Sequence, residues 1–203
     1  MSILETHKLS FAYPGQSPLL SDFDFRTESS ERTELRAPSG RGKTTFCRLL
    51  AGYLKATSGA IILDGKPLPK KGRCPIQLIG QHPETAVDPR LRLRLTLEEA
   101  APLTPDNGNQ ELLERLGIRN EWLQRYPHEL SGGELQRFCV ARALMANPQF
   151  LIADEITTML DAVTQVQIWK ALLEEATKRG FGMILVTHSP ALSKRIATRV
   201  VEL

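Results

Sequence analysis

Three short stretches of the sequence carry residue types that bind phosphate or activate water. The first is SGRGKTT at positions 39–45, where small residues, one lysine and two threonines precede an apolar helical pattern. Backbone N–H groups at the start of a helix can cradle an anion, and Gly40 and Gly42 let the backbone approach phosphate oxygens closely. Lys43 can reach the β- or γ-phosphate, and the Thr44 hydroxyl can ligate Mg²⁺. The stretch therefore predicts a nucleotide phosphate site.

This loop departs from the usual pattern G-x-x-x-x-G-K-[ST] at its first position, which holds Ala37. An alanine adds one methyl group and has little access to positive φ. However, Ala37 precedes the residues that would wrap the phosphates. A glycine- and lysine-rich turn without a ligand is the alternative for this stretch alone, so the surrounding structure must decide.

The second stretch, FLIADE at 150–155, is a buried apolar run that ends in Asp154 and Glu155. Open α/β sheets bind ligands at the carboxyl ends of their strands, where Asp154 can hold Mg²⁺ and Glu155 can polarise a water for attack on a γ-phosphate. The third, LSGGELQR at 130–137, places Ser131 and two glycines at the start of a helix, a second anion-binding terminus. The alternative for the second stretch is a strand that ends in two solvated acids, and the alternative for the third is an ordinary capped helix.

The elements that would position these stretches alternate between strands and helices. Strands are expected within 3–13, on both sides of a polar turn within 19–38, within 58–63 and within 75–83, and a helix is expected after the phosphate loop. Residues 82–147 are richer in helix formers, chiefly in the stretches that begin at 95, 109 and 132 and end at 102, 118 and 148. Residues 150–155 and 182–189 are continuous apolar runs, typical of parallel strands covered on both faces, and an amphipathic helix between them stops at Gly180. The pattern predicts a mixed α/β fold with a βαβ unit.

With LSGG just before the acidic strand motif and the phosphate loop upstream, nearly the whole chain resembles the ATPase subunits of ATP-binding-cassette (ABC) transporters. The resemblance implies an α/β P-loop NTPase core with an N-terminal antiparallel β-subdomain and an inserted α-helical subdomain. It implies one domain, 1–203, in which 1–81 and 148–203 form the nucleotide-binding core and 82–147 the helical subdomain. ATP and Mg²⁺ are the implied cofactors.

The resemblance also assigns roles to single residues, and edge-strand packing is the alternative for Tyr13. Tyr13 matches the aromatic residue that stacks on adenine, with Phe11 a weaker candidate, and Asp161 matches the aspartate of the loop at the dimer interface. The implied catalytic residues are Glu155, His188, Gln81 and Lys43. The implied ATP contacts are Tyr13, Pro38, Ser39, Gly40, Arg41, Gly42, Lys43, Thr44, Thr45 and Gln81. The implied Mg²⁺ ligands are Thr44, Gln81 and Asp154. The residues implied to contact the ATP bound by a facing subunit are Ser131, Gly132, Gly133 and Glu134.

Departures from the family pattern are few. Besides Ala37, isoleucine replaces the proline common after the catalytic glutamate, at Ile156, and the chain stops at RVVEL where relatives usually continue. Neither substitution removes a charged or metal-binding group, which favours a working site. The stretches QHPETAVDPR and DEITTMLDAVTQVQIWK are similar to the importer subgroup for peptides, nickel and metal–opine chelates. Arg90, Arg92 and Arg94 would contact a membrane subunit or form a solvated face.

Composition bounds the alternatives. The 203 residues are 41% hydrophobic and carry a formal charge of +3, which is too weak to indicate nucleic acid. The three cysteines are far apart, so we expect buried thiols. No membrane-spanning run or leader pattern is evident, and we expect a peripheral protein at the cytoplasmic face of the inner membrane, soluble when isolated.

The implied function is hydrolysis of ATP by the subunit that powers an ABC importer. Its partners would be integral membrane permeases, a second ATPase subunit that is either a paralogue or the same chain, and indirectly an extracytoplasmic binding protein. Two alternatives stay open, namely a soluble ABC ATPase without a transport role and a nucleotide-binding module with weak turnover.

Overall fold

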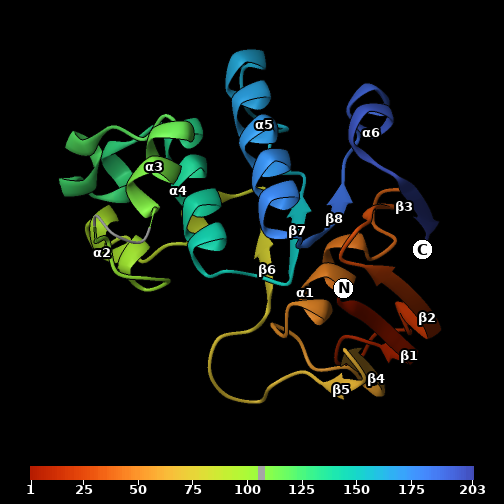
Figure 1. Ribbon diagram of the computed structural model, residues 1–203. Coiled ribbons are helices and arrows are strands. Elements are labelled where there is room, and N and C mark those ends of the chain that lie inside the picture. Colours follow the sequence, from red (N-terminus) through yellow and green to blue (C-terminus); the bar gives the residue numbers. More distant parts are fainter. Residues whose placement is uncertain (105–107) are drawn as a thin grey trace. The chain divides into compact units, whose positions relative to one another are not determined.

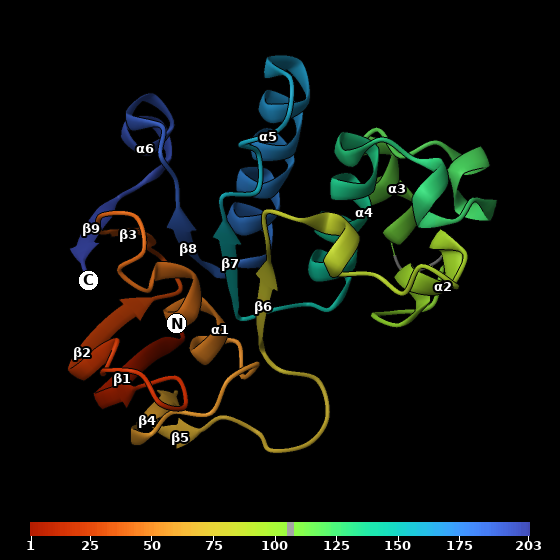
Figure 2. The same ribbon diagram turned by 180° about the vertical axis from the view of Figure 1, so that it is seen from behind.

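The computed structural model describes residues 1–104 and 108–203. Contacts divide the chain into two compact units, drawn from opposite sides in Figures 1 and 2. The first unit comprises Met1–Leu78, Pro148–Asp154 and Gly180–Leu203, and the second comprises Ile79–Asn147 and Glu155–Arg179. This division is one of contacts, and the functional boundaries given above, with 82–147 as the helical subdomain, stay a prediction.

An antiparallel sheet begins the first unit. Its strands are β1 (Ile3–Phe11), β2 (Leu20–Glu28), β4 (Ser58–Leu63) and β5 (Lys66–Pro67), in the order β2-β1-β4-β5. Leu4, Thr6, Leu9 and Phe11 of β1 are buried. Apolar residues spaced in this way cover one face of a strand, apart from the register shift between Thr6 and Leu9. The expected strands at 3–13 and 58–63 are thereby confirmed.

The other sheet of the first unit has the strand order β6-β7-β8-β3-β9. Its strands are β3 (Arg32–Arg36), β6 (Ile76–Ile79), β7 (Phe150–Asp154), β8 (Gly182–Val186) and β9 (Arg199–Glu202). Strands β7 and β8 are buried at every position and pair in parallel, with Asp154 opposite Val186. The predicted βαβ unit is therefore confirmed, as is the mixed α/β fold class.

Helix α1 (Lys43–Leu50) joins the cores of the two sheets. Phe46 is fully buried and meets Phe23 and Phe25 of β2 edge to face, with ring centroids 5.2 and 5.3 Å apart. Leu35 and Ile152 of the parallel sheet belong to the same cluster of buried side chains. This core holds the start of α1 against both sheets.

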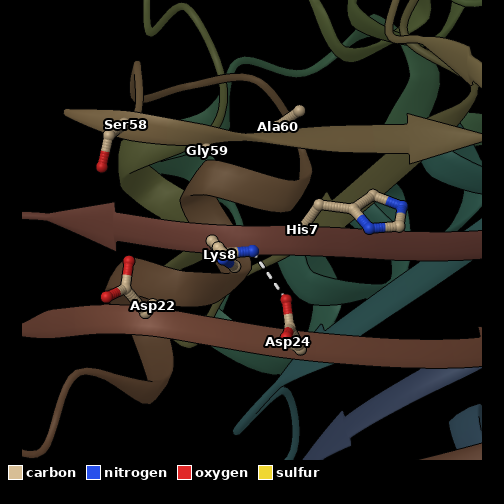
Figure 3. A pocket seen from close by; sticks show the side chains of 7 residues that line it. All are labelled: His7, Lys8, Asp22, Asp24, Ser58, Gly59 and Ala60. Carbon is tan, nitrogen blue, oxygen red and sulfur yellow. Dashed lines mark hydrogen bonds between the residues drawn. The ribbon is translucent and has the colours of Figure 1, made fainter.

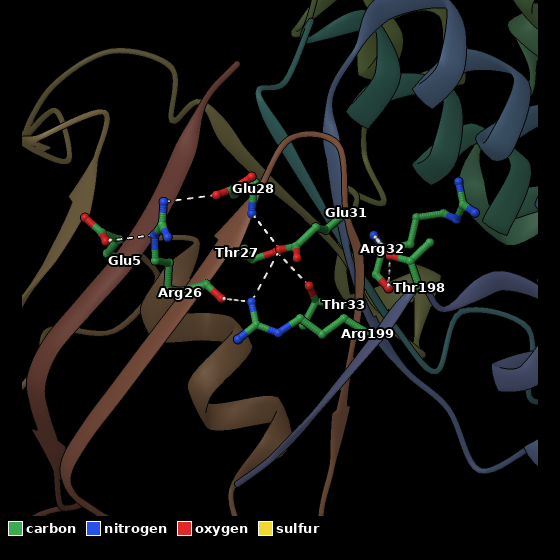
Figure 4. Close-up of polar contacts among 9 residues, drawn as sticks. All are labelled: Glu5, Arg26, Thr27, Glu28, Glu31, Arg32, Thr33, Thr198 and Arg199. Carbon is green, nitrogen blue, oxygen red and sulfur yellow. Dashed lines mark hydrogen bonds and ion pairs between the residues drawn. The ribbon is translucent and has the colours of Figure 1, made fainter.

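The turn between β2 and β3 carries the chain from one sheet to the other. Figure 4 shows the Glu31 carboxylate at this turn. It accepts hydrogen bonds from the Thr27 hydroxyl at 3.3 Å, from the Glu28 N–H at 3.0 Å and from the Arg199 guanidinium at 3.4 Å. One side chain thus connects β2, the turn and β9. Strand β9 and the preceding helix α6 (Pro190–Ile196) were not predicted from the sequence.

The second unit is helical. Its helices are α2 (Leu93–Glu98), α3 (Asn109–Arg115), α4 (Gly132–Met145) and α5 (Ala162–Arg179), with short 3₁₀ turns η1 (Pro83–Thr85), η3 (Asn120–Gln124) and η4 (Pro127–Glu129). The Glu175 carboxylate of α5 is fully buried and pairs with the guanidinium groups of Arg115 and Arg179. Helices α2, α3 and α4 overlap the stretches rich in helix formers at 95–102, 109–118 and 132–148, and α5 is the amphipathic helix expected to stop at Gly180. Among the described residues, no helix has the length and apolar character needed to cross a bilayer.

Candidate functional site

The phosphate loop connects β3 to α1 in the first unit. Gly42 caps the helix at φ 93° and Gly40 lies at φ 78°, a left-handed region that glycine occupies without strain. A Cβ at Gly42 would lie 2.9 Å from Cγ of Leu19. The described residues with positive φ do not include Ala37, so an alanine fits there without backbone strain. The first turn of α1 leaves N–H groups without helical partners, as an anion cradle requires.

Lys43 folds back across this loop. Its ammonium donates to the carbonyl oxygens of Ala37 at 2.7 Å and Pro38 at 3.3 Å, and the residue is 8% exposed. Position 37 thus contributes a backbone acceptor, which any residue can supply. The two carbonyls hold the lysine head group over the backbone of the loop.

The two threonines of the loop have different surroundings. The hydroxyls of Thr45 and Tyr13 lie 3.2 Å apart and share a hydrogen bond, and Thr45 is 8% exposed. Thr44, in contrast, is exposed. The bond brings the Tyr13 ring to the side of the loop, and the same ring meets Phe11 edge to face with centroids 4.9 Å apart. Tyr13 therefore has strand packing as well as a position beside the loop.

The carboxyl ends of three neighbouring strands meet at one edge of the parallel sheet. The loop follows β3, Asp154 ends β7, and His188 comes two residues after β8. Asp154 is 5% exposed, whereas His188 is exposed. Ligands bind at this edge of open α/β sheets.

Cys47 on α1 reports on the charges near the loop. Burial raises the pKa of its thiol well above the ordinary value, and the negative charge of Asp154 raises it further, while Lys43 acts in the opposite direction. A carboxylate and an ammonium therefore both lie near the same helix. A carboxylate together with the exposed Thr44 hydroxyl is a hard-oxygen donor set of the kind that suits Mg²⁺.

In the second unit, Ser131 caps helix α4 as predicted. Its hydroxyl accepts from the Glu134 N–H at 3.3 Å, and the Glu134 carboxylate accepts from the Ser131 N–H at 2.8 Å. This hydrogen bond from the Ser131 backbone lowers the pKa of the Glu134 carboxyl, with smaller contributions from Arg125 and Arg119. Ser131 and Gly132 are exposed, so the helix start is open to a ligand.

Gln81 and Gly132 line one cavity of about 90 Å³ within the second unit. The remaining lining residues are His82, Pro83, Glu84, Gln136, Ile156, Met159 and Leu160. The fold thus brings Gln81, predicted as a Mg²⁺ ligand, and Gly132, predicted to contact a facing subunit, to the same hollow, although 50 residues separate them in the sequence.

The segment after β7 makes a tight turn. Glu155 has φ 53°, and its carbonyl accepts from the N–H and the hydroxyl of Thr158 at 3.2 and 3.0 Å. Asp161 then caps α5 by accepting from the N–H groups of Val163 and Thr164, both at 3.0 Å, and the bond from Thr164 is the main cause that lowers the pKa of its carboxyl. The two predicted acidic residues of this segment therefore stand at either end of one short loop.

A family model described as "ABC transporter" matches residues 20–158, more than half of the chain. The chain belongs to the ABC transporter family. It is 35% identical to a glutathione import ATP-binding protein of Pectobacterium atrosepticum, in an alignment covering 98% of this chain and 36% of that protein. It is 30% identical to an oligopeptide transport ATP-binding protein of Haemophilus influenzae, covering 95% of this chain and 62% of that protein. The chain thus spans about a third to two thirds of the length of these relatives.

The fold of this ABC transporter family member also matches solved structures. One described as the ATP-binding subunit of an ABC transporter superposes with a TM-score of 0.86 at 26% identity, covering 99% of this chain and 85% of that chain. The likeness confirms the P-loop NTPase fold class. The roles assigned to single residues stay predictions.

Some predicted surface residues of this family member have structural partners. Arg90 binds Asp88, and Arg94 binds Glu98 four residues along α2. Arg92 donates to the Gln124 carbonyl at 2.5 Å and lies over the Tyr126 ring.

The prediction that all three cysteines are buried thiols needs one correction. Cys47 and Cys139 are buried, but Cys74 is only partly buried, since it lies in the loop before β6 and packs against the edge of the core.

Sequence reasoning missed two residues of helix α4 that connect the segments described above. Gln136 donates to the Gly80 carbonyl, next to Gln81. Arg137 donates to the Leu116 carbonyl at 2.7 Å and to Thr164 and Gln167 of α5 at 3.1 and 2.8 Å. Their partners lie 21 to 56 residues away, so no local pattern could have identified them.

A second hollow, of about 570 Å³, lies over the antiparallel sheet of the first unit (Figure 3). It is lined by His7, Lys8, Asp22, Asp24, Ser58, Gly59 and Ala60. The Lys8 N–H donates to Asp24 at 2.6 Å, and a Cβ at Gly59 would lie 2.3 Å from the Lys8 carbonyl oxygen. Its lining residues lie on the paired strands β1, β2 and β4, and none of the predicted site residues is among them.

Proposed function

We propose that this chain binds ATP with Mg²⁺ and hydrolyses it as the ATPase subunit of an ABC importer. The observation that carries the proposal is the edge of the parallel sheet, where the loop with Lys43, the carboxylate of Asp154 and the imidazole of His188 follow three neighbouring strands. A phosphate cradle, a metal ligand and a polar contact for a γ-phosphate then come from one edge. Membership of the ABC transporter family supports the same nucleotide.

Each residue takes a distinct role in this proposal. Residues 38–45 bind the phosphates, with Lys43 as the point charge, and Tyr13 stacks on the adenine. Thr44, Asp154 and Gln81 would hold Mg²⁺, which would neutralise phosphate charge. Glu155 accepts a proton from the attacking water, and His188 contacts the γ-phosphate.

The test of chemistry is Glu155→Gln, with phosphate release and nucleotide binding measured separately. The amide keeps the shape of the side chain and loses its basicity, so turnover should fall by at least about 100-fold while ATP binding persists. Glu174→Gln on α5 is the matched control, because Glu174 is an exposed carboxylate that pairs with Lys170. Wild-type turnover in the Glu155→Gln protein would show that Glu155 has another role.

For transport, the relatives favour peptides as the cargo class. The names of these relatives refer to import of glutathione and transport of oligopeptides. Nickel and metal–opine chelates stay a prediction from the sequence pattern. The chain would bind integral membrane permeases at the cytoplasmic face of the membrane, served by an extracytoplasmic binding protein. Co-purification with permease subunits supports this role, whereas an ATPase that never binds a membrane protein would be a soluble ABC ATPase.

Two chains, or this chain and a paralogue, would share each ATP. The exposed start of α4 offers Ser131, Gly132, Gly133 and Glu134 to a nucleotide on the facing subunit, with Asp161 in the interface. The Glu155→Gln protein with ATP and Mg²⁺ should therefore form a dimer by light scattering, alone or with its partner ATPase. Ser131→Arg should block the dimer and leave ATP binding by the monomer intact. If only monomers appear with the Glu155→Gln protein alone and also with the partner ATPase added, a shared site is excluded.

A further inference from the structure

One glutamine of α4 is buried where the helix passes the loop that contains Gln81. Gln136 is 1% exposed, and its side-chain amide donates to the Gly80 carbonyl oxygen at 3.1 Å. Both residues belong to the second unit. A buried hydrogen bond of this kind stabilises the arrangement by about the free energy of a tenfold change in an equilibrium constant.

The acceptor of this bond is the carbonyl of a glycine that no side chain of its own holds in place. Gly80 has no side chain, and a Cβ built there would meet nothing within 4 Å, so packing does not fix it. Its carbonyl belongs to the rigid peptide plane that also contains the N–H of Gln81. The bond from Gln136 therefore fixes the orientation of the peptide from which Gln81 starts.

Gln81 and Gln136 also line the same cavity of about 90 Å³. The buried Oε1 atom of Gln136 accepts no hydrogen bond from any residue that the structure describes. The cavity has room for ordered water, and a buried acceptor of this kind is satisfied by such water. The Gln136 amide thus donates to the peptide before Gln81 and offers an acceptor for water in the cavity that Gln81 also lines.

We propose that Gln136 is a positioning residue that orients Gln81 for Mg²⁺. This inference rests on the proposed role of Gln81 as a ligand. Gln136 follows Ser131 by five residues on the same helix, so α4 both presents its open start to a partner and holds the peptide before the metal-binding side chain. Loss of the bond should therefore weaken the response to the metal and spare the binding of nucleotide alone.

The test uses the full chain and a non-hydrolysable fluorescent ATP analogue, titrated in EDTA and then at increasing Mg²⁺. Gln136→Met keeps the length of the side chain and removes the donor. It should raise the Mg²⁺ concentration for half of the metal-induced gain in affinity about five- to tenfold, while affinity in EDTA changes less than about twofold. Thr96→Val is the matched control, because Thr96 is a 1% exposed polar residue of the same unit, on α2. It should leave the metal response unchanged.

A rescue variant separates positioning from general stability. Gly80→Ala places a methyl group in open space and narrows the freedom of the loop without the bond. In the Gln136→Met background it should bring the Mg²⁺ requirement back to within about threefold of the wild type. If Gln136→Met fails to fold, Gln136→Leu, which is shorter and also lacks the donor, carries the measurement.

The outcomes are distinct. An unchanged Mg²⁺ requirement in Gln136→Met, an equal shift in Thr96→Val, no recovery with Gly80→Ala, or unfolding of both Gln136 variants would each overturn the positioning role. A wild-type chain that binds the analogue in neither condition would instead overturn the proposed function.

Discussion

Exchanges of glycine and alanine within the phosphate loop separate backbone requirements from motif matching. Ala37 has no positive φ, whereas Gly40 and Gly42 lie at φ 78° and 93°. Ala37→Gly should lower the free energy of unfolding by about 0.4–1 kcal/mol, because glycine widens the unfolded ensemble. ATP affinity should change by less than about threefold, since the Ala37 carbonyl that Lys43 binds is kept.

The reverse exchanges should cost more. Gly40→Ala meets open space and should cost about 1–2 kcal/mol from the left-handed backbone alone. Gly42→Ala adds a Cβ 2.9 Å from Leu19 Cγ, so overpacking of about 1–3 kcal/mol is added to the same strain. The expected total is about 2–5 kcal/mol, reduced if the half-buried Leu19 shifts.

Urea unfolding and titration with a fluorescent ATP analogue measure both quantities on the same four proteins. From most to least stable, the expected order is wild type, Ala37→Gly, Gly40→Ala and Gly42→Ala. A Gly42→Ala protein as stable as Ala37→Gly would refute the strain argument. A gain in affinity above about a hundredfold in Ala37→Gly, equivalent to about 2.7 kcal/mol, would show that the alanine cripples the site.

Three further predictions follow from contacts in the two units. Lys43→Met should weaken ATP binding about 10- to 100-fold through loss of a charge-assisted bond, yet change the free energy of unfolding by less than about 1 kcal/mol, because water can solvate the loop carbonyls; fluorescence titration and urea unfolding check this. Glu134→Gln should be less stable than the wild type by about 0.5 kcal/mol at neutral pH. Because the folded pKa of this carboxyl lies below its ordinary 4.5, the difference is fully present above that pH and should disappear as the pH falls through the folded pKa, which unfolding at stepped pH measures. Trp169→Phe removes the buried bond from the indole N–H to the Thr157 hydroxyl at 3.1 Å, and should lower the melting temperature without changing ATP affinity, as calorimetry and titration would show.

Local patterns predicted the elements well where one segment determines its own burial. The runs 150–154 and 182–186 are apolar throughout, and the structure buries both as parallel strands. Ser131 with two glycines at the start of a helical stretch was enough to predict a helix cap, and the bonds that form the cap join residues only three apart. The phosphate loop likewise carries its chemistry within a few residues.

Other features depend on partners far along the chain. The polar turn near Glu31 predicted two strands but not that β2 and β3 enter different sheets, since that depends on pairing of β3 with β8 and β9. Strand β9 is exposed at most positions, so it lacks the apolar run that would reveal it. Gln136 could not be linked to Gly80 from sequence, because only the packed second unit brings residues 56 apart together.

The left-handed backbone of Glu155 has a consequence for how this chain would change under selection. A non-glycine residue at φ 53° costs about 1–2 kcal/mol, and asparagine or glycine occupies that region more readily. Position 155 is therefore one where the residue proposed for chemistry is not the residue that the backbone prefers. In a library screened only for folded protein, Asn and Gly should become enriched at this position. Such a screen would select inactive variants over active ones, and only a screen that requires ATP turnover would retain the glutamate.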